Sequence, residues 1–151
     1  GTVITAGEVQ RMTAGSGVQH SEFNHSQTDE LHLLQIWMFP EHKDLEPGYE
    51  QTLFSREDKL NHLRLIASRD GREGSVTVHQ NIDLYACILQ PGTDIEHGVA
   101  ESGKVFVQII SGELTVNGQS VSAGDGVQIS DEHRLLINSQ SETEFLLFDM
   151  G

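Results

Sequence analysis

Two side chains with the chemistry of metal ligands stand close together near the start of the chain. His20 and Glu22 are two positions apart in the glycine-rich stretch of residues 15–22. In an extended strand alternate side chains share a face, and these two Cα atoms would lie roughly 6.5 to 7 Å apart. An imidazole and a carboxylate at that spacing can converge on one transition-metal ion. The carboxylate could also act as a base toward a bound substrate.

The spacing alone leaves a second interpretation open, because a His-x-Glu pair also arises by chance on the wet face of a strand. The other histidines offer little help. His32 lies in an apolar run and is predicted to be a packed, hydrogen-bonded core residue. His97 and His133 could form a second site in the C-terminal half, although an ordinary structural role is favoured for both. The rest have no partner at ligand spacing: His25, His42, His62 and His79.

The elements that must position these residues are short strands separated by turn signals, which predicts an all-β fold. The clearest signal is the hairpin of residues 113–121, where Asn117 and Gly118 suit a tight type I′ turn. A connection in the middle of the chain is expected to hold a short strand at residues 50–54 and about one turn of helix. Further strands are predicted at residues 1–5, 20–22, 31–37, 105–110, 127–129 and 144–148.

A short internal repeat suggests two related lobes. Residues 5–10 and 122–127 each place Ala-Gly-acid at a turn and then enter an apolar strand. One repeat of this size is weak evidence alone, and it gains weight from the similar strands around both copies.

Composition restricts the class of function. The chain carries 23 acidic residues against 9 basic ones, for a formal charge of -14, which disfavours nucleic acid or an anionic membrane as a partner. The longest apolar run, residues 31–39, is too short to cross a bilayer. The single cysteine, Cys87, excludes an intrachain disulfide, agrees with a cytoplasmic location and lies in an apolar run that predicts a buried, inert thiol.

The order and spacing of several segments resemble the pirin family, and in particular its bacterial members assigned quercetin 2,3-dioxygenase activity. The likeness begins with the stretch from Met12 to Glu22 and continues nearly to the end of the chain. It is carried by residues 12–22, 31–37, 49–51, 78–85 and 146–149, with Pro40.

Pirins are similar to bicupins, so the resemblance implies an all-β cupin fold of the double-stranded β-helix type with two lobes. In that family the N-terminal lobe binds a metal through three histidines and one glutamate. His20 and Glu22 match the last two ligands, whereas no His-x-His segment occurs in the chain. The family would place that segment before Gly1. We therefore expect the C-terminal two-thirds of a bicupin: residues 1–45 end the N-terminal metal-binding lobe, 46–72 connect, and 73–151 form a complete, barrel-like C-terminal lobe.

The resemblance implies a metal-dependent dioxygenase that opens flavonols such as quercetin with O2. Glu22 would be both ligand and catalytic base, and the activity is expected to be absent from a chain with half of the ligand set. The metal would be a divalent transition ion, with Fe(II) favoured and Mn, Ni, Cu and Zn open. The alternative is a non-catalytic, metal-binding regulator or protein-interaction module. Gln35 and Trp37 could line the pocket, although packing within the sheet is favoured for both.

A lobe without its opening strands would leave apolar side chains without cover. Unpaired strand edges and bare apolar faces favour association. We therefore expect self-association, or pairing with the absent N-terminal segment. The side chains expected to lose cover are Val3, Val9, Val18, Leu33 and Ile36.

Overall fold

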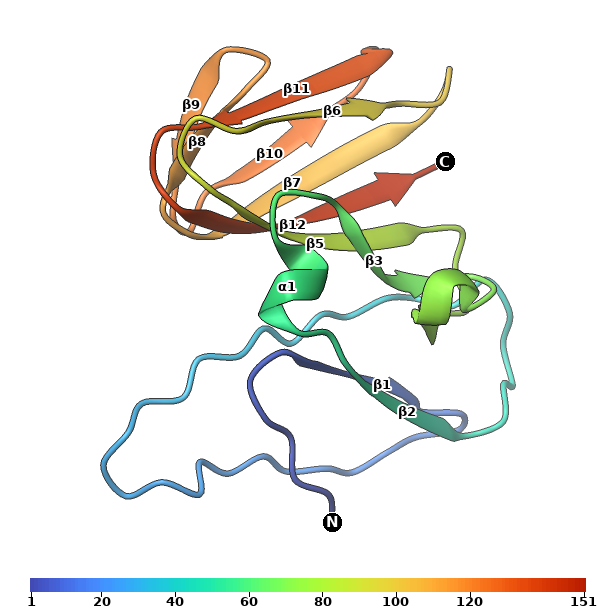
Figure 1. Ribbon diagram of the computed structural model, residues 1–151. Helices are drawn as coiled ribbons and strands as arrows, with labels where there is room; N and C mark the ends of the chain where they lie inside the picture. The colour runs from blue at the N-terminus through green and yellow to red at the C-terminus, as the bar shows by residue number, and fades with distance from the viewer.

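The computed structural model describes all residues from 1 to 151, and it confirms an almost entirely β architecture (Figure 1). Its only helices are α1 (Arg56–Lys59) and one 3-10 turn, η1 (Arg72–Gly74). The strands are β1 (Glu8–Thr13), β2 (Gly48–Leu53), β3 (Arg64–Ser68), β4 (Val76–Thr77), β5 (Asp83–Leu89), β6 (Asp94–Gly98), β7 (Lys104–Ser111), β8 (Glu113–Val116), β9 (Gln119–Ser122), β10 (Gly126–Ile129), β11 (Arg134–Ser139) and β12 (Thr143–Met150).

Two sheets face each other in the C-terminal part of the chain (Figure 1). A six-stranded sheet has the order β10-β7-β12-β5-β3-β4, and a four-stranded sheet has the order β6-β11-β8-β9. Neighbouring strands are antiparallel except for β3 and β4. No ladder joins the two sheets, so the barrel-like lobe expected from the sequence is a cupin-type sandwich that does not close into a barrel.

The main core fills the space between these sheets because alternate residues of each strand point inward. Fifteen buried apolar residues form this cluster, and Phe145, Leu147 and Leu135 are fully buried within it. Strand β12 is covered on both faces, since Leu146 belongs to a second cluster on the other side of the sheet. Its continuous apolar sequence is what a strand buried on both faces requires.

The predicted hairpin of residues 113–121 is confirmed by β8 and β9, which pair from Glu113↔Ser122 to Val116↔Gln119. The turn residues Asn117 and Gly118 have φ of 48° and 81°. These are the two positive values that a type I′ turn needs, and they match the right-handed twist of the flanking strands.

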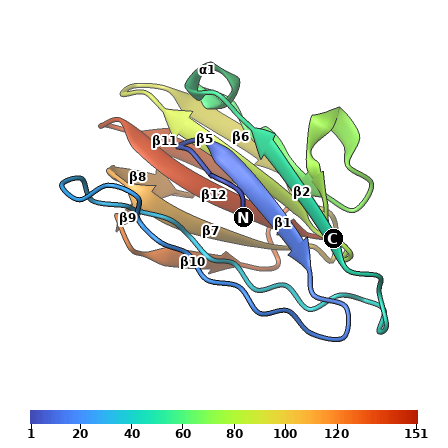
Figure 2. The ribbon, with the colours of Figure 1, turned by 90° about the horizontal axis from the view of Figure 1, so that it is seen from below.

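A second, smaller hairpin lies on the other face of the six-stranded sheet. Strands β1 and β2 pair along six residues from Glu8↔Leu53 to Thr13↔Gly48, and the hairpin lies below the sheet in Figure 1 and in front of it in Figure 2. Val9 packs against the second apolar cluster, whose members include Phe54, Ile66 and Leu146. The predicted short strand and helical turn of the connection are therefore confirmed, and α1 begins at a Ser55–Asp58 capping box.

The hairpin is also tied to the sheet by a partly buried polar contact. The Glu50 carboxylate accepts a hydrogen bond from the Thr77 backbone N–H at 2.7 Å and one from the Arg11 guanidinium. Burial disfavours the charged form of Glu50, and these hydrogen bonds outweigh it, so the pKa of the carboxyl lies below its usual value.

The internal repeat appears as the same turn in two places. Asp125 Oδ2 accepts hydrogen bonds from Ser122 N at 2.9 Å and Ser122 Oγ at 3.1 Å. Glu8 Oε2 accepts the matching pair from Thr5 N and Thr5 Oγ1. The glycines between them, Gly7 and Gly124, have φ of 89° and 91°. One local sequence therefore builds one turn at the entry to β1 and to β10.

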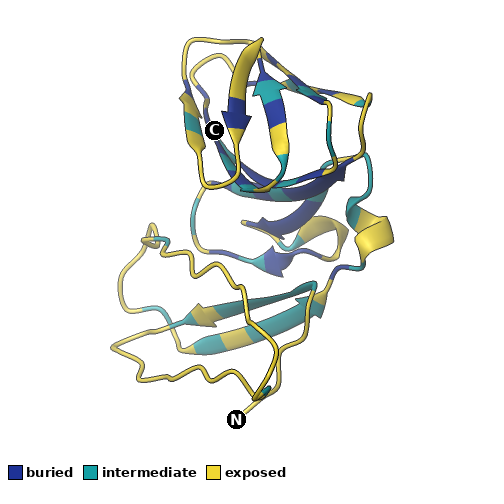
Figure 3. Cartoon of the chain, turned by 90° about the vertical axis from the view of Figure 1, so that its left-hand side faces the viewer, coloured by how far each residue is buried: buried dark blue, intermediate teal, exposed yellow.

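Three of the predicted strands are wrong, because residues 1–5, 20–22 and 31–37 have no hydrogen-bonded partner strand. The whole of residues 14–47 lies outside regular structure, and Figure 3 shows this part of the chain almost entirely exposed. The prediction of a buried His32 is wrong for the same reason, since no sheet covers it. The expected exposure of apolar side chains is confirmed for Val3, Val18, Leu33 and Ile36, whereas Val9 is half-buried.

Cys87 is fully buried in the main core, as its apolar surroundings predicted. Burial raises the pKa of the Cys87 thiol to about 12, so the thiolate is scarce at neutral pH. None of the helices has the length and apolar character needed to cross a membrane.

Candidate metal centre

His20 and Glu22 lie in the long exposed segment between β1 and β2. The backbone there passes through Gly15 and Gly17, whose φ values of 56° and 146° favour glycine. An alanine Cβ at Gly15 would lie 2.8 Å from Pro47, so the start of the segment depends on a residue without a side chain. Both candidate ligands are exposed, and neither sits on a strand. Their joint role as metal ligands stays a prediction.

His20 makes one side-chain contact, with Gln35 from further along the same segment. The Gln35 Nε2 and His20 Nε2 atoms are 3.2 Å apart. An amide nitrogen can only donate, so the His20 nitrogen is the acceptor and its lone pair faces the amide. The favoured expectation that Gln35 packs within a sheet is wrong, since no sheet forms there.

The Glu22 carboxylate makes no hydrogen bond and no ion pair. No group of three or more His, Cys, Asp or Glu side chains in the chain is arranged to hold a metal ion. An imidazole whose lone pair accepts a hydrogen bond from Gln35, and a free carboxylate, nevertheless have the donor types for two positions of a mixed nitrogen and oxygen ligand set. The residues present therefore suit part of a transition-metal site, and a tight site needs further ligands.

The C-terminal lobe contains a second polar cluster that the sequence did not reveal. His97 Nε2 lies 2.8 Å from Asp149 Oδ2, and the two side chains are 14% and 18% exposed. The Tyr85 ring meets the His97 ring edge-on, with centroids 5.6 Å apart. Burial raises the pKa of the Tyr85 hydroxyl, and the neighbouring Asp83 carboxylate raises it further. His133 is exposed and joins this lobe only through its backbone, so it does not complete a site with His97.

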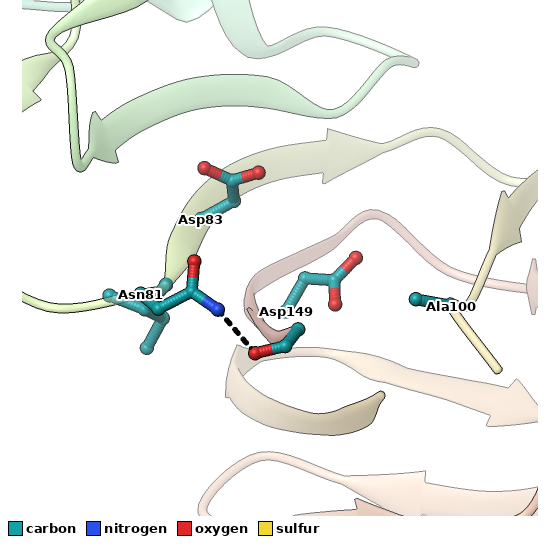
Figure 4. Close-up of a pocket in the computed structure, with 6 residues that line it drawn as sticks. Asn81, Asp83, Ala100 and Asp149 are labelled. Atoms are coloured by element: carbon teal, nitrogen blue, oxygen red, sulfur yellow. Dashed lines mark hydrogen bonds between the residues drawn. The ribbon is translucent and has the colours of Figure 1, made fainter. Parts of the chain in front are cut away.

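A shallow hollow of about 210 Å³ adjoins this cluster (Figure 4). Asp83 and Asp149 stand directly opposite each other on β5 and β12, and both line the hollow. Each carboxylate already has a cationic or imidazole partner, because Arg72 binds Asp83 and His97 binds Asp149. The Asn81 amide donates to the Gly151 carbonyl at the rim. The His97–Asp149 pair joins β6 of the four-stranded sheet to β12 of the six-stranded sheet, so it serves as a structural bridge between them.

Two family matches cover most of the chain. Residues 65–150 match the quercetinase C-terminal cupin domain, and residues 1–38 match the pirin domain. The fold described above is a cupin fold, and the first match alone spans more than half of the chain. The chain therefore belongs to the pirin family.

Its relatives carry the name of an enzyme. The chain is 42% identical over 147 residues to quercetin 2,3-dioxygenase of Escherichia coli K12, a match that covers 97% of the chain and 62% of that relative. It is 34% identical to a putative quercetin 2,3-dioxygenase of Pasteurella multocida, across 99% of the chain and 64% of that relative. The chain thus spans somewhat less than two-thirds of the length of these relatives.

Solved structures support the same placement. The crystal structure of YhhW from Escherichia coli superposes with a TM-score of 0.91 at 40% identity, covering 98% of this chain and 62% of that one. Bacterial pirin YhhW in complex with nickel(II), from the same organism, gives a TM-score of 0.90 at 41% identity, with 97% and 62% covered. The extended segment that carries His20 is therefore included in an arrangement shared with a metal-binding relative.

Proposed function

We propose that this chain is part of a metal-dependent dioxygenase that opens flavonols such as quercetin with O2. The observation that carries the proposal is the 42% identity, along 97% of the chain, to a quercetin 2,3-dioxygenase. The nickel(II) complex of a similar pirin supports a divalent transition metal as the cofactor. The donor types of His20 and Glu22 suit nickel, iron, manganese, copper or zinc and do not select among them.

His20 and Glu22 would hold the ion from this chain, with the remaining ligands supplied from outside residues 1–151. His20 offers Nε2, whose lone pair already faces a donor. Glu22 offers a carboxylate that no other group of the chain engages. A bound divalent ion would supply positive charge that stabilises a deprotonated flavonol.

Glu22 has a second task in this proposal, as the base that accepts the proton of the flavonol 3-hydroxyl. The proton moves from that oxygen to a Glu22 carboxylate oxygen and leaves the flavonol as an anion. An exposed carboxylate without a hydrogen-bond donor is free to take this role, whereas a paired one such as Asp149 is not.

The second candidate is a non-catalytic, metal-binding regulator that acts by binding another protein. The observation in its favour is the exposed apolar surface of the extended segment. Phe23, Trp37 and Phe39 are 83%, 81% and 83% exposed, and large exposed aromatic groups are typical of protein interfaces. Self-association, or pairing with a further segment of the same protein, would cover the same side chains. We place the protein in the cytoplasm, in keeping with its lone, buried thiol.

Oxygen uptake with quercetin tests the two candidates against each other. The whole protein, loaded with nickel or iron, should consume O2 when quercetin is added. Glu22→Gln should abolish this turnover, because an amide supplies neither the negative charge nor the basic oxygen. Glu30→Gln, an exposed carboxylate in the same segment, is the matched control and should retain it. Metal-loaded protein that consumes no O2 would favour the regulator, and equal turnover in both variants would remove Glu22 from the mechanism.

A further inference from the structure

The contact between Gln35 and His20 joins two parts of the exposed segment that are distant in sequence. The segment has a first arm, residues 14–23, and a second arm, residues 31–40. The Gln35–His20 contact at 3.2 Å is the only hydrogen bond that joins the two arms. The chain reverses between them through local bonds of the Asn24–Asp29 turn, which do not reach either arm's candidate ligands. Gln35 is therefore the one side chain of the second arm that engages the His20 ring.

The chemistry of this contact matters more than its strength. Gln35 donates through Nε2, so it uses the lone pair of His20 Nε2. Histidine binds metals through the same kind of lone pair, at a metal–nitrogen distance of about 2.0–2.1 Å. An ion and the amide hydrogen would therefore compete for one position beside the ring. A structural packing residue would contact the ring face or edge and leave that position open.

We infer that Gln35 competes with the metal ion for His20, because its amide occupies the nitrogen that an ion would take and must yield that nitrogen when the ion binds. This inference rests on the proposed function, since it assigns a partner to a ligand of that site.

Competition and a purely structural role predict opposite changes in metal affinity when the Gln35 amide is removed. If Gln35 must leave His20 before a metal binds, then removing the amide should strengthen metal binding at His20. The net stabilisation from one exposed neutral hydrogen bond corresponds to about a two- to tenfold change in affinity. If Gln35 only held the ring in place, its removal would loosen the ring and weaken binding instead.

The test is a Zn²⁺ titration of the 151-residue protein, labelled with ¹⁵N and followed by NMR at the His20 ring and the Gln35 side-chain amide. Three proteins are compared: the natural sequence, Gln35→Leu and Gln27→Leu. Gln27 is an exposed glutamine of the same segment that makes no hydrogen bond, so its substitution controls for the loss of an amide. In the natural protein and in Gln27→Leu, the Gln35 amide signals should shift in the same step as the His20 ring. Gln35→Leu should bind Zn²⁺ at His20 about two- to tenfold more tightly.

The outcomes separate the inference from the proposed function. A His20 ring that responds to Zn²⁺ while the Gln35 amide signals stay fixed would overturn the inference alone. Unchanged or weaker Zn²⁺ binding in Gln35→Leu would also overturn it. A His20 ring that responds in none of the three proteins would instead contradict the proposed role of His20 as a ligand, and the inference would fall with it.

Discussion

The same turn occurs near the start of the chain and in the C-terminal lobe, but the strand that follows it joins a small hairpin in one case and a large sheet in the other. The turn at Thr5–Glu8 leads into β1, and the turn at Ser122–Asp125 leads into β10, with matching hydrogen bonds and glycine conformations. Strand β10 joins a six-stranded sheet that faces a second sheet across a buried core. Strand β1 pairs only with β2, and the 34 residues between those strands, 14–47, join no sheet.

The turn forms from residues adjacent in sequence, whereas the burial of apolar side chains requires contacts with strands that are distant in the sequence. A serine or threonine, a glycine and an acid are enough to build the turn wherever they occur. Burial needs further strands, and the exposed segment lacks them within this chain. The consequence is that apolar residues of similar kind contribute very differently to stability in the two regions.

The largest expected effect comes from deleting matched phenylalanines in the two regions. Phe145 is fully buried in the main core, and Phe23 is 83% exposed. Phe145→Ala should lower the free energy of unfolding by about 3–5 kcal/mol, because it removes apolar contacts and leaves a cavity. Phe23→Ala should change it by no more than about 0.5 kcal/mol. Urea denaturation of both variants measures the contrast, and a large loss in Phe23→Ala would mean that the segment is covered after all.

The exposed aromatic groups should also drive association of the 151-residue protein. Trp37 and Phe39 are 81% and 83% exposed, and burying them against another molecule is favourable. We expect light scattering to show species larger than a monomer at high concentration. Replacing both residues by serine should shift the distribution toward monomer. Replacing the buried residues Leu135 and Leu147 would instead affect folding, so it does not test association. A monodisperse monomer of the natural protein at high concentration would contradict this prediction.

A smaller effect should distinguish the two copies of the repeated turn. Gly124→Ala places a side chain at positive φ in open space, which should cost about 1–2 kcal/mol. Gly7→Ala carries the same backbone strain, and its Cβ would also lie 2.8 Å from the Phe54 carbonyl oxygen. Amide hydrogen exchange should therefore speed up at Phe54, which donates to the Gly7 carbonyl, more than at Gly124's neighbours in the other variant. Equal local effects in the two variants would show that the close approach at Gly7 is relaxed at no cost.

The smallest effect concerns the carboxylate that attaches the hairpin to the sheet. The folded pKa of Glu50 is lowered from about 4.5, so its stabilising contribution is present above that pH and is lost as the pH falls through the folded value. The difference in unfolding free energy between the natural protein and Glu50→Gln should therefore shrink as the pH is lowered below 4.5. Glu30→Gln, at an exposed carboxylate without a partner, is the control and should show no such dependence. A difference that stays constant with pH would mean that the Glu50 side chain stabilises the fold through packing and not through its charge.

Much of the C-terminal lobe could be predicted from its sequence because its signals are local. The Asn117–Gly118 turn and the β-branched run of β7 each indicate their structure without reference to distant residues. Residues 31–37 show a similar strand pattern and form no strand, because a ladder also needs a partner and none is present. The sequence pattern of a segment therefore indicates its propensity to form a strand, but it does not indicate whether a partner strand is available for pairing.

The candidate site shows the same division between local and distant information. His20 and Glu22 were found from their spacing and their family resemblance. The Gln35 contact joins residues 15 positions apart across two irregular arms, and the His97–Asp149 pair joins residues 52 positions apart across two sheets. Neither pairing has a sequence signature, since each depends on how the backbone folds back in space.

We propose that the metal site belongs to the segment carrying His20 and Glu22 and not to the polar cluster of the C-terminal lobe. The measurement that tests it is the metal content of the whole protein after dialysis, determined for the natural sequence and three variants. We predict that His20→Ala and Glu22→Gln lose most of the bound metal, because each removes a ligand. His97→Asn should keep it, since His97 is engaged by Asp149. Metal retained in both His20→Ala and Glu22→Gln, or lost in His97→Asn, would contradict the account.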